Sequence, residues 1–200
     1  MTERGIGRPV GSTDARDHLE RAAWQLFQTR GYDAVTTQAI ATIAGCSQRT
    51  FFRHYPTKED VVLSWMDGHN KAICARISAD PSPGSAPAVL RRALDVYGDM
   101  SAPDRERLAA LSRLATSSPA LLGGIRARQG KWEDAIAATL VAHPLLDVGE
   151  IQSFHLAAYA MAALGVAMRM SARPGSGTTA EHLDAAFELL RDEHPHTPIR

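Results

Sequence analysis

The chain has 200 residues, of which 44% are hydrophobic, 22% charged and 6% aromatic, a globular balance that excludes a disordered or fibrous chain. Lys and Arg together number 22, as do Asp and Glu, so the formal net charge is zero and a strong uniform attraction to nucleic acid is excluded. The charge is uneven, however, because residues 1–58 hold eight basic and five acidic residues, whereas residues 59–200 hold fourteen and seventeen.

Three short helices are predicted between residues 14 and 57, after a stretch from 1 to 13 whose arginines and glycines predict a flexible basic arm. The first helix has apolar residues at three- and four-residue spacing from Leu19 to Phe27. Capping residues and glycines mark the helix ends. In chain order they are Ser12, Thr13 and Asp14 as alternative N-caps, Gly31 as a stop, Thr36 and Thr37 as caps, Gly45 as a stop, Ser47 as a cap and Pro56 as a stop.

Longer helices separated by Pro, Gly and Ser are predicted beyond Pro56. They span roughly 58–79, 86–100, 104–116, 119–143, 147–172 and 178–192. No segment combines apolar–polar alternation with enrichment in β-branched residues, so no strand is predicted. We therefore expect an all-α fold, with an N-terminal helix-turn-helix domain at 14–57, a larger helical domain at 58–193 and a tail at 194–200.

Residues 36–59 have the pattern of a helix-turn-helix motif, in which a tight turn containing glycine joins two short helices. Gly45 permits the positive φ that such a turn requires. The apolar residues on either side are expected to form a small core, with Cys46 as a buried and unreactive thiol. These apolar residues are Ile40, Ile43, Ala44 and Phe51.

Positive charge is concentrated in the second helix of this motif, because residues 45–58 contain three basic residues, Arg49, Arg53 and Lys58, and no acid. A helix that reads the major groove needs hydrogen-bonding side chains near its N-terminus, and Gln48, Arg49 and Thr50 supply them. The donors placed for phosphate contacts are Thr37, Ser47, His54 and Lys58. A pair of short helices with solvated arginines has a similar pattern, so a motif without DNA binding stays open as the alternative.

Residues 31–63 closely resemble the TetR family of transcriptional regulators. The resemblance is carried by the Gly-Tyr before Thr-Thr, by the Ile-Ala…Ala-Gly-Cys-Ser turn, and by Thr-Phe-Phe-Arg-His-Tyr-Pro-Thr-Lys-Glu-Asp leading into a long helix. It covers about residues 14–65 and implies a three-helix DNA-binding domain followed by a helical ligand-binding and dimerisation domain. By family position, the base-facing residues are Thr37, Gln38, Gln48, Arg49 and Thr50, and the backbone-facing residues are Ser47, Phe52, His54 and Lys58. Phe52 departs from the family, which often has a tyrosine there, and lacks its phosphate-bonding hydroxyl.

A ligand pocket in the second domain should be mostly apolar, with a few polar groups that orient the ligand. The candidate ligand contacts are Trp65, His69, Trp132, His155 and Tyr159. Each also fits ordinary core packing, which stays open as the alternative. Residues 118–135 are loosely similar to a branch of the family that senses acyl-CoA-like ligands, which implies phosphate contacts from Arg126, Arg128 or Lys131; otherwise these three form a solvated helix face.

The segments 147–172 and 178–192 resemble the dimerisation helices of the family and imply a homodimer. A symmetric dimer presents two recognition helices to a palindromic operator. We therefore expect a cytoplasmic repressor that a small-molecule effector releases from its operator. The alternative is a helical ligand-binding or interaction module without sequence-specific DNA binding.

Several other functions are not expected from the sequence. No catalytic motif is found, so an enzyme is not expected, and no cofactor or metal is predicted. Two cysteines, Cys46 and Cys74, are too few for a disulfide scaffold and lack metal-ligand spacing. The N-terminus lacks the apolar segment of a signal peptide, and the most apolar run, 156–168, is shorter than the roughly 20 residues that span a bilayer.

Overall fold

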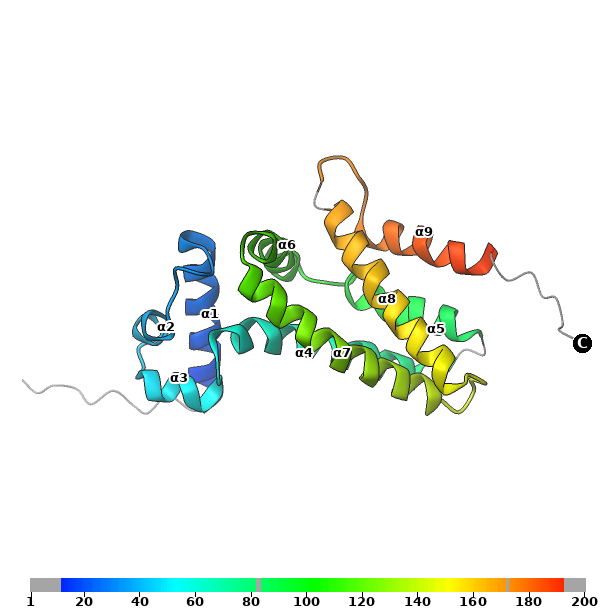
Figure 1. The fold of residues 1–200 in the computed structure, drawn as a ribbon, viewed down its shortest axis with the longest axis horizontal. Helices are drawn as coiled ribbons and strands as arrows, with labels where there is room; N and C mark the ends of the chain where they lie inside the picture. The colour runs from blue at the N-terminus through cyan, green and yellow to red at the C-terminus, as the bar shows by residue number, and fades with distance from the viewer. Residues whose placement is uncertain (1–11, 82–83, 172, 193–200) are drawn as a thin grey trace, which may run out of the picture. The chain divides into compact units, whose positions relative to one another are not determined.

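The structure is a computed structural model that describes residues 12–81, 84–171 and 173–192 (Figure 1). Within these ranges it consists of helices and connecting loops and has no strand, so the predicted all-α fold is confirmed. The predicted basic arm falls almost entirely, and the predicted tail entirely, outside the described residues. The helices are α1 Ser12–Arg30, α2 Thr37–Ile43, α3 Gln48–His54, α4 Lys58–Ala79, α5 Ala86–Ala93, the 3-10 helix η1 Leu94–Val96, α6 Ala102–Ser117, α7 Pro119–Val141, α8 Glu150–Ser171 and α9 Thr179–Asp192.

Two predicted helices differ in extent from those observed. The segment predicted at 86–100 is helical only to Ala93, because the chain then tightens into η1, where Tyr97 N donates to Leu94 O at 3.0 Å. The helix predicted from 147 starts at Glu150, after a turn in which Leu146 N donates to His143 O. Both differences lie at helix ends, where local hydrogen bonding competes with continuation of the helix.

The chain divides into two compact units between Val62 and Leu63, within α4. The first turn of α4 therefore packs with the N-terminal unit, a few residues beyond the boundary predicted at 57. The core of this unit contains Phe27 of α1, Ile40 of α2 and Phe51 of α3, all fully buried. Ile43, which was expected in the same core, is 47% exposed, because α2 turns Ile40 and Ala41 inward instead.

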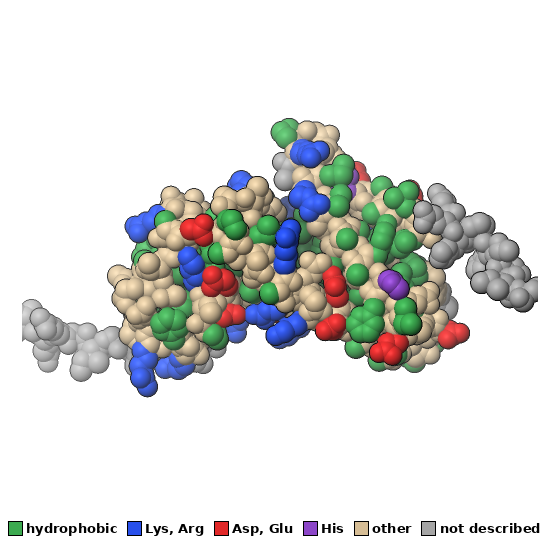
Figure 2. Space-filling model, in the orientation of Figure 1, with side chains coloured by type: hydrophobic (Ala, Val, Ile, Leu, Met, Phe, Trp, Pro, Cys, Tyr) green, Lys and Arg blue, Asp and Glu red, His purple; other side chains and the backbone are tan. Residues whose placement is uncertain are grey.

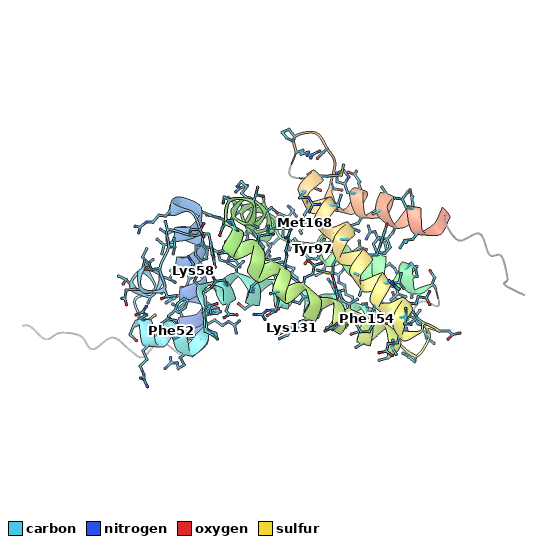
Figure 3. The ribbon with its side chains drawn as sticks, viewed as in Figure 1. Phe52, Lys58, Tyr97, Lys131, Phe154 and Met168 are labelled. Carbon is cyan, nitrogen blue, oxygen red and sulfur yellow. The ribbon has the colours of Figure 1, made fainter. Side chains whose placement is uncertain are left out.

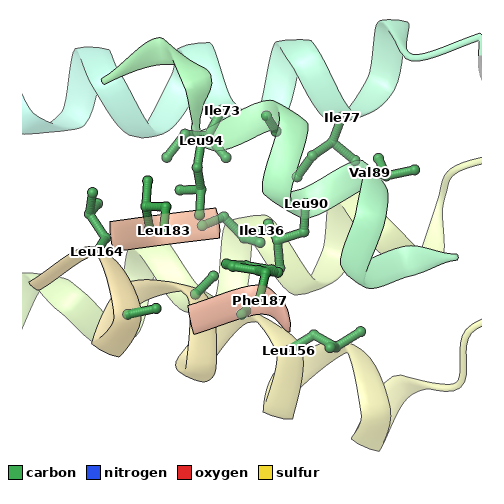
Figure 4. Packing of buried hydrophobic residues seen from close by; sticks show 14 of the residues in the cluster. Ile73, Ile77, Val89, Leu90, Leu94, Ile136, Leu156, Leu164, Leu183 and Phe187 are labelled. Carbon is green, nitrogen blue, oxygen red and sulfur yellow. The ribbon is translucent and has the colours of Figure 1, made fainter. Parts of the chain in front are cut away.

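The C-terminal unit contains the rest of α4 and α5 to α9 around one apolar core (Figure 4). Full burial of a side chain such as Leu or Phe contributes about 1.5–3 kcal/mol. On its buried face α8 has small residues that allow neighbouring helices to approach closely. The residues at the centre of the core are Ile73 and Ile77 of α4, Val89 and Leu90 of α5, Leu94 of η1, Ile136 of α7, Leu156 and Leu164 of α8, and Leu183 and Phe187 of α9.

Helix α8 is also long and apolar enough, by length and composition, to cross a membrane: it has 22 residues and a mean hydropathy of 1.4 over its most apolar window. The apolar run identified in the sequence, 156–168, is shorter than this helix, because it leaves out the polar residues that precede it in α8. Seven residues of α8 are buried in the C-terminal unit, including Leu156, Leu164 and a series of alanines. Packing in the core therefore accounts for part of its apolarity.

A buried tyrosine joins α1 to the end of α3. The Tyr55 hydroxyl donates to Glu20 Oε1 at 2.5 Å and accepts from Arg16 Nε at 3.0 Å, while the ring is 1% exposed. Burial raises the pKa of Tyr55, and the Glu20 carboxylate adds to this effect. The pKa of Tyr32, also buried in this unit, is raised mainly by burial and further by Glu59.

In the unfolded chain these tyrosines ionise near pH 10, whereas in the folded protein they stay neutral to higher pH. The stabilisation that comes from keeping them neutral is therefore complete below about pH 10 and is lost as the pH rises further. We expect the free energy of unfolding in urea to decline from pH 8 to pH 11. In Tyr55→Phe this decline should be smaller by about 1 kcal/mol. The variant lacks one of the tyrosines that ionise in the unfolded chain while staying neutral in the folded protein. Equal declines in the two proteins would contradict the role of Tyr55.

Candidate nucleic-acid interface and ligand pocket

The turn between α2 and α3 depends on Gly45, which has a φ of +71°. Its N–H donates to Thr42 O at 3.2 Å, and the N–H of Cys46 donates to Ala41 O at 2.9 Å, which closes the C-terminus of α2. A side chain at this φ is strained, so glycine is favoured. Ser47 then caps α3 by accepting from Thr50 N at 3.1 Å, as predicted.

The polar side chains at the start of α3 are partly engaged with α2 and partly free for a ligand. Gln48 Nε2 donates to Thr37 Oγ1 at 2.9 Å, which links the two helices. The hydroxyls of Ser47 and Thr50 lie 3.0 Å apart. Arg49 is exposed, and Figure 2 shows Lys and Arg side chains at the end of the N-terminal unit where α3 lies. This end of the unit is the candidate nucleic-acid interface.

The remaining predicted contacts on α2 and α3 differ in exposure. Gln38 is exposed and donates to Thr42 Oγ1 at 3.3 Å. Phe52 is 49% exposed (Figure 3), so its ring is available for contact although it lacks a hydroxyl. His54 is half-buried, and its Nε2 is buried without a hydrogen-bond partner in the described part of the chain.

Lys58, predicted as a phosphate contact, binds backbone carbonyls of its own unit in this structure. Its Nζ donates to Tyr32 O at 2.9 Å, Val35 O at 3.0 Å and Asp33 O at 3.4 Å. It also lies 4.3 Å from the centroid of the Tyr32 ring. An ammonium has three N–H donors, so these three carbonyls use all of them. Lys58 therefore fixes the loop between α1 and α2 and has no donor left for a phosphate in this structure.

The turn cysteine fits the predicted inert thiol only in part. Cys46 is half-buried rather than fully buried. Burial raises the pKa of its thiol, and the charge of Arg53 opposes this shift in part. A raised pKa lowers the fraction of thiolate, which is the reactive form.

The C-terminal unit contains a cavity of about 650 Å³. Residues from α4, α6, α7 and α8, together with Tyr97 after η1, form its walls, which are mostly apolar and aromatic. A cavity of this size accommodates a small organic molecule. Its aromatic and methionine lining residues are Trp65, Met66, Tyr97, Trp132, Met161 and Met168, and its polar lining residues include Asn70, Ser112, Thr116, Arg126, Gln129 and Arg169.

The five predicted ligand contacts do not form one site. Trp65 and Trp132 line the cavity, whereas His69 supports its wall by stacking on Tyr97 at 5.4 Å between ring centroids. His155 and Tyr159 lie instead at a separate, more open hollow beside α8 and α9. His155 is exposed, because it lies on the outer face of α8.

The predicted phosphate contacts of α7 are also separated. Arg128 forms an ion pair with Asp67 at 2.7 Å, and the same carboxylate accepts from Trp132 Nε1 at 2.6 Å. Lys131 is exposed and does not line the cavity, so only Arg126 of the three does so.

Sequence reasoning missed Asn70 and Arg169 as cavity residues. Asn70 is 7% exposed, and its Oδ1 is buried without a hydrogen-bond partner among the described residues. It lies at helical spacing with Met66, Ile73 and Ile77 on one face of α4. A lone amide in such an apolar stripe is the signal that could have identified it.

Apolar side chains are exposed on α8 and α9, and hydrophobic side chains gather there in Figure 2. Monomeric proteins rarely expose extended apolar surface without a partner. The exposed residues are Ile151 at 75%, Phe154 at 42%, Val166 at 45% and Met170 at 36% on α8, with Leu189 at 64% on α9.

The N-terminal unit has a basic helix behind a glycine turn, and α4 joins it to a helical unit with an apolar cavity. These two features define a helix-turn-helix regulator that responds to a ligand. Comparison with known families agrees. Residues 20–64 match the bacterial regulatory proteins of the tetR family, and residues 85–195 match the MftR C-terminal domain. The chain belongs to the tetR family and is a helix-turn-helix transcriptional regulator.

Curated relatives and solved structures support this assignment. The HTH-type transcriptional regulator TcmR of Streptomyces glaucescens is 29% identical over 185 residues, which cover 88% of this chain and 81% of TcmR. MftR of Mycobacterium tuberculosis is 25% identical over 191 residues, 94% of each chain. FadR of Thermus thermophilus, a repressor solved with lauroyl-CoA, shares the fold with a TM-score of 0.60 at 24% identity, over 92% of this chain and 98% of its own.

The positive φ of Gly45 predicts a specific cost of substitution. We expect Gly45→Ala to lower the free energy of unfolding by about 1 kcal/mol or more, because alanine is strained in this conformation. Gly130→Ala is the matched control, since Gly130 lies inside α7 with open space around its Cα and should gain about 0.5–1 kcal/mol. Urea unfolding measures both, and equal effects would contradict the role of the turn.

Proposed function

We propose that two copies of this chain bind a palindromic operator as a repressor and release it when a small molecule fills the cavity of the C-terminal unit. The observation that carries this proposal is the acid-free start of α3, where Arg49 is exposed behind the Gly45 turn. We propose Arg49, Gln48 and Thr50 as base contacts. The flanking hydroxyls and the exposed Phe52 are proposed to contact the DNA backbone.

Helix α4 supplies a covalent route between the two sites. Its first residue, Lys58, holds the loop before α2, while Trp65 and Asn70 further along the same helix line the cavity. A ligand that shifts α4 would therefore change the position of the recognition helix. Opposed binding of effector and operator typically corresponds to a coupling free energy of about 1–3 kcal/mol.

The effector is proposed to have an apolar body. An acyl-CoA-like molecule is one candidate, because FadR was solved with lauroyl-CoA and because Arg126 and Arg169 line the cavity here. We propose binding rather than catalysis, in the cytoplasm, since the named relatives are transcriptional regulators.

The alternative function is a helical ligand-binding module that does not recognise DNA sequence. Three of the predicted contacts support DNA binding instead, because Arg49 and Ser47 are exposed and Gln48 is fixed against α2. The first experiment below distinguishes the two functions.

Arg49→Ala tests the base-reading role. We expect this change to reduce the ratio of operator to random-sequence affinity at least tenfold, because one good base contact contributes about 1–3 kcal/mol of discrimination. Fluorescence anisotropy with an operator selected from a random DNA pool measures both affinities. Arg113→Ala, an exposed arginine of α6, controls for the loss of one charge.

An equal loss of affinity on operator and random DNA would overturn the role of Arg49. A wild-type protein that selects no sequence from the pool would support the module without DNA recognition.

Phe154→Glu tests the dimer through the outer face of α8. We expect the dimer dissociation constant to rise at least tenfold, because a carboxylate placed in an apolar interface loses its hydration. Light scattering after size exclusion distinguishes a 21.6 kDa monomer from a dimer of twice that mass. Ile43→Glu is the matched control, since Ile43 is equally exposed but lies in the N-terminal unit. A wild-type monomer, or dimers that persist in Phe154→Glu, would count against this interface.

A further inference from the structure

An orphaned amide lies in the wall of the cavity. Asn70 is 7% exposed, and its Oδ1 is buried with no hydrogen-bond partner in the described part of the chain. A buried polar group without a partner costs about 1–3 kcal/mol, so native proteins satisfy nearly all of them. The Oδ1 of Asn70 lacks a partner, and Asn70 lines the cavity, so a ligand bound there is a candidate source of the missing donor.

Three other polar side chains that line the cavity each have a hydrogen-bond partner. The Ser112 hydroxyl donates to Leu108 O at 3.2 Å, and the Thr116 hydroxyl donates to Ser112 O at 2.9 Å. Gln129 Nε2 donates to Glu133 Oε1 at 2.7 Å. Among these polar residues of the cavity, Asn70 is the one with a buried polar atom that has no hydrogen-bond partner in the described part of the chain.

Aromatic side chains line the same cavity as Asn70. Trp65 and Trp132 line the same cavity, and Tyr97 lines it with its ring stacked on His69. The indole of Trp132 is fixed by the Asp67 carboxylate, so its orientation is set before a ligand enters. Fixed aromatic walls favour a flat apolar ligand that stacks on them or meets their edges.

We propose that the effector is an aromatic, ring-containing molecule whose hydroxyl pairs with the side-chain amide of Asn70. The unpaired Oδ1 of Asn70 is an acceptor, so it needs a donor, and a hydroxyl supplies one. A saturated acyl chain has no such group and would leave the amide unpaired. The proposal rests on the effector site proposed above and specifies the chemistry of its ligand.

Two matched probes test the proposal: 2-naphthol, which has a phenolic hydroxyl, and 2-methoxynaphthalene, in which a methyl group replaces the proton. Calorimetric titration of the full-length protein should show at least tenfold tighter binding of 2-naphthol. In Asn70→Leu, which has a similar volume and no polar atoms, this preference should disappear. Ser117→Ala is the control and should keep the preference, because the Ser117 hydroxyl donates to Leu114 O and Ser117 does not line the cavity.

A thermal melt separates a ligand role from a structural one. Asn70→Leu should melt no lower than the wild type, because the change removes an unpaired buried group. A lower melting temperature would show that Asn70 serves the fold, and would overturn the proposal. Equal wild-type affinity for the two probes, or a preference that persists in Asn70→Leu, would also overturn it.

The acyl-CoA alternative and the repressor function are tested separately. Binding of lauroyl-CoA without binding of either naphthalene would replace the aromatic ligand with an acyl one. Operator binding by Asn70→Leu is measured without any probe and should equal that of the wild type. Failure of wild-type operator binding counts against the repressor, whereas the comparison of the two probes concerns the ligand alone.

Discussion

The ammonium of Lys58 satisfies three backbone carbonyls of the loop that follows α1, and the arrangement of the DNA-binding unit depends on this contact. Loops between helices expose carbonyls that need partners, and a single lysine supplies three donors at one point. With this loop fixed, Thr36 caps α2, and the Gly45 turn directs α3. The same lysine is the first residue of α4, so the helix that lines the cavity begins at the residue that holds the recognition motif together.

Local signals in the sequence predicted the helix-turn-helix well, because caps and glycines act through adjacent backbone atoms. Thr36, Ser47 and Gly45 behave as predicted, since each position depends on residues only a few steps away. The exposure of Ile43 and the inward contacts of Lys58 were not predicted, because both depend on how α1, α2 and α4 pack together. A lysine in a basic segment does not reveal from sequence whether it contacts solvent or distant carbonyls.

The lining of the cavity was predicted only in part. The tryptophans Trp65 and Trp132 were found because large aromatic residues are both frequent in pockets and easy to notice. Asn70 was missed because what distinguishes it is a buried Oδ1 without a hydrogen-bond partner in the described part of the chain. This property depends on tertiary packing and leaves no pattern in the neighbouring sequence. His155 and Tyr159 were grouped with the tryptophans, but they lie on a different part of α8 from the cavity.

Helix α8 buries small alanines on one face and exposes large apolar residues on the other. When two copies pair through that outer face, assembly and folding share one equilibrium, because pairing removes folded chains from the folding reaction. The thermal stability of the protein then increases with its own concentration, and the regulator is most resistant to unfolding when many copies are present. At low copy number the folded fraction of the protein is smallest. The concentration of folded dimer therefore falls faster than the total concentration of the protein.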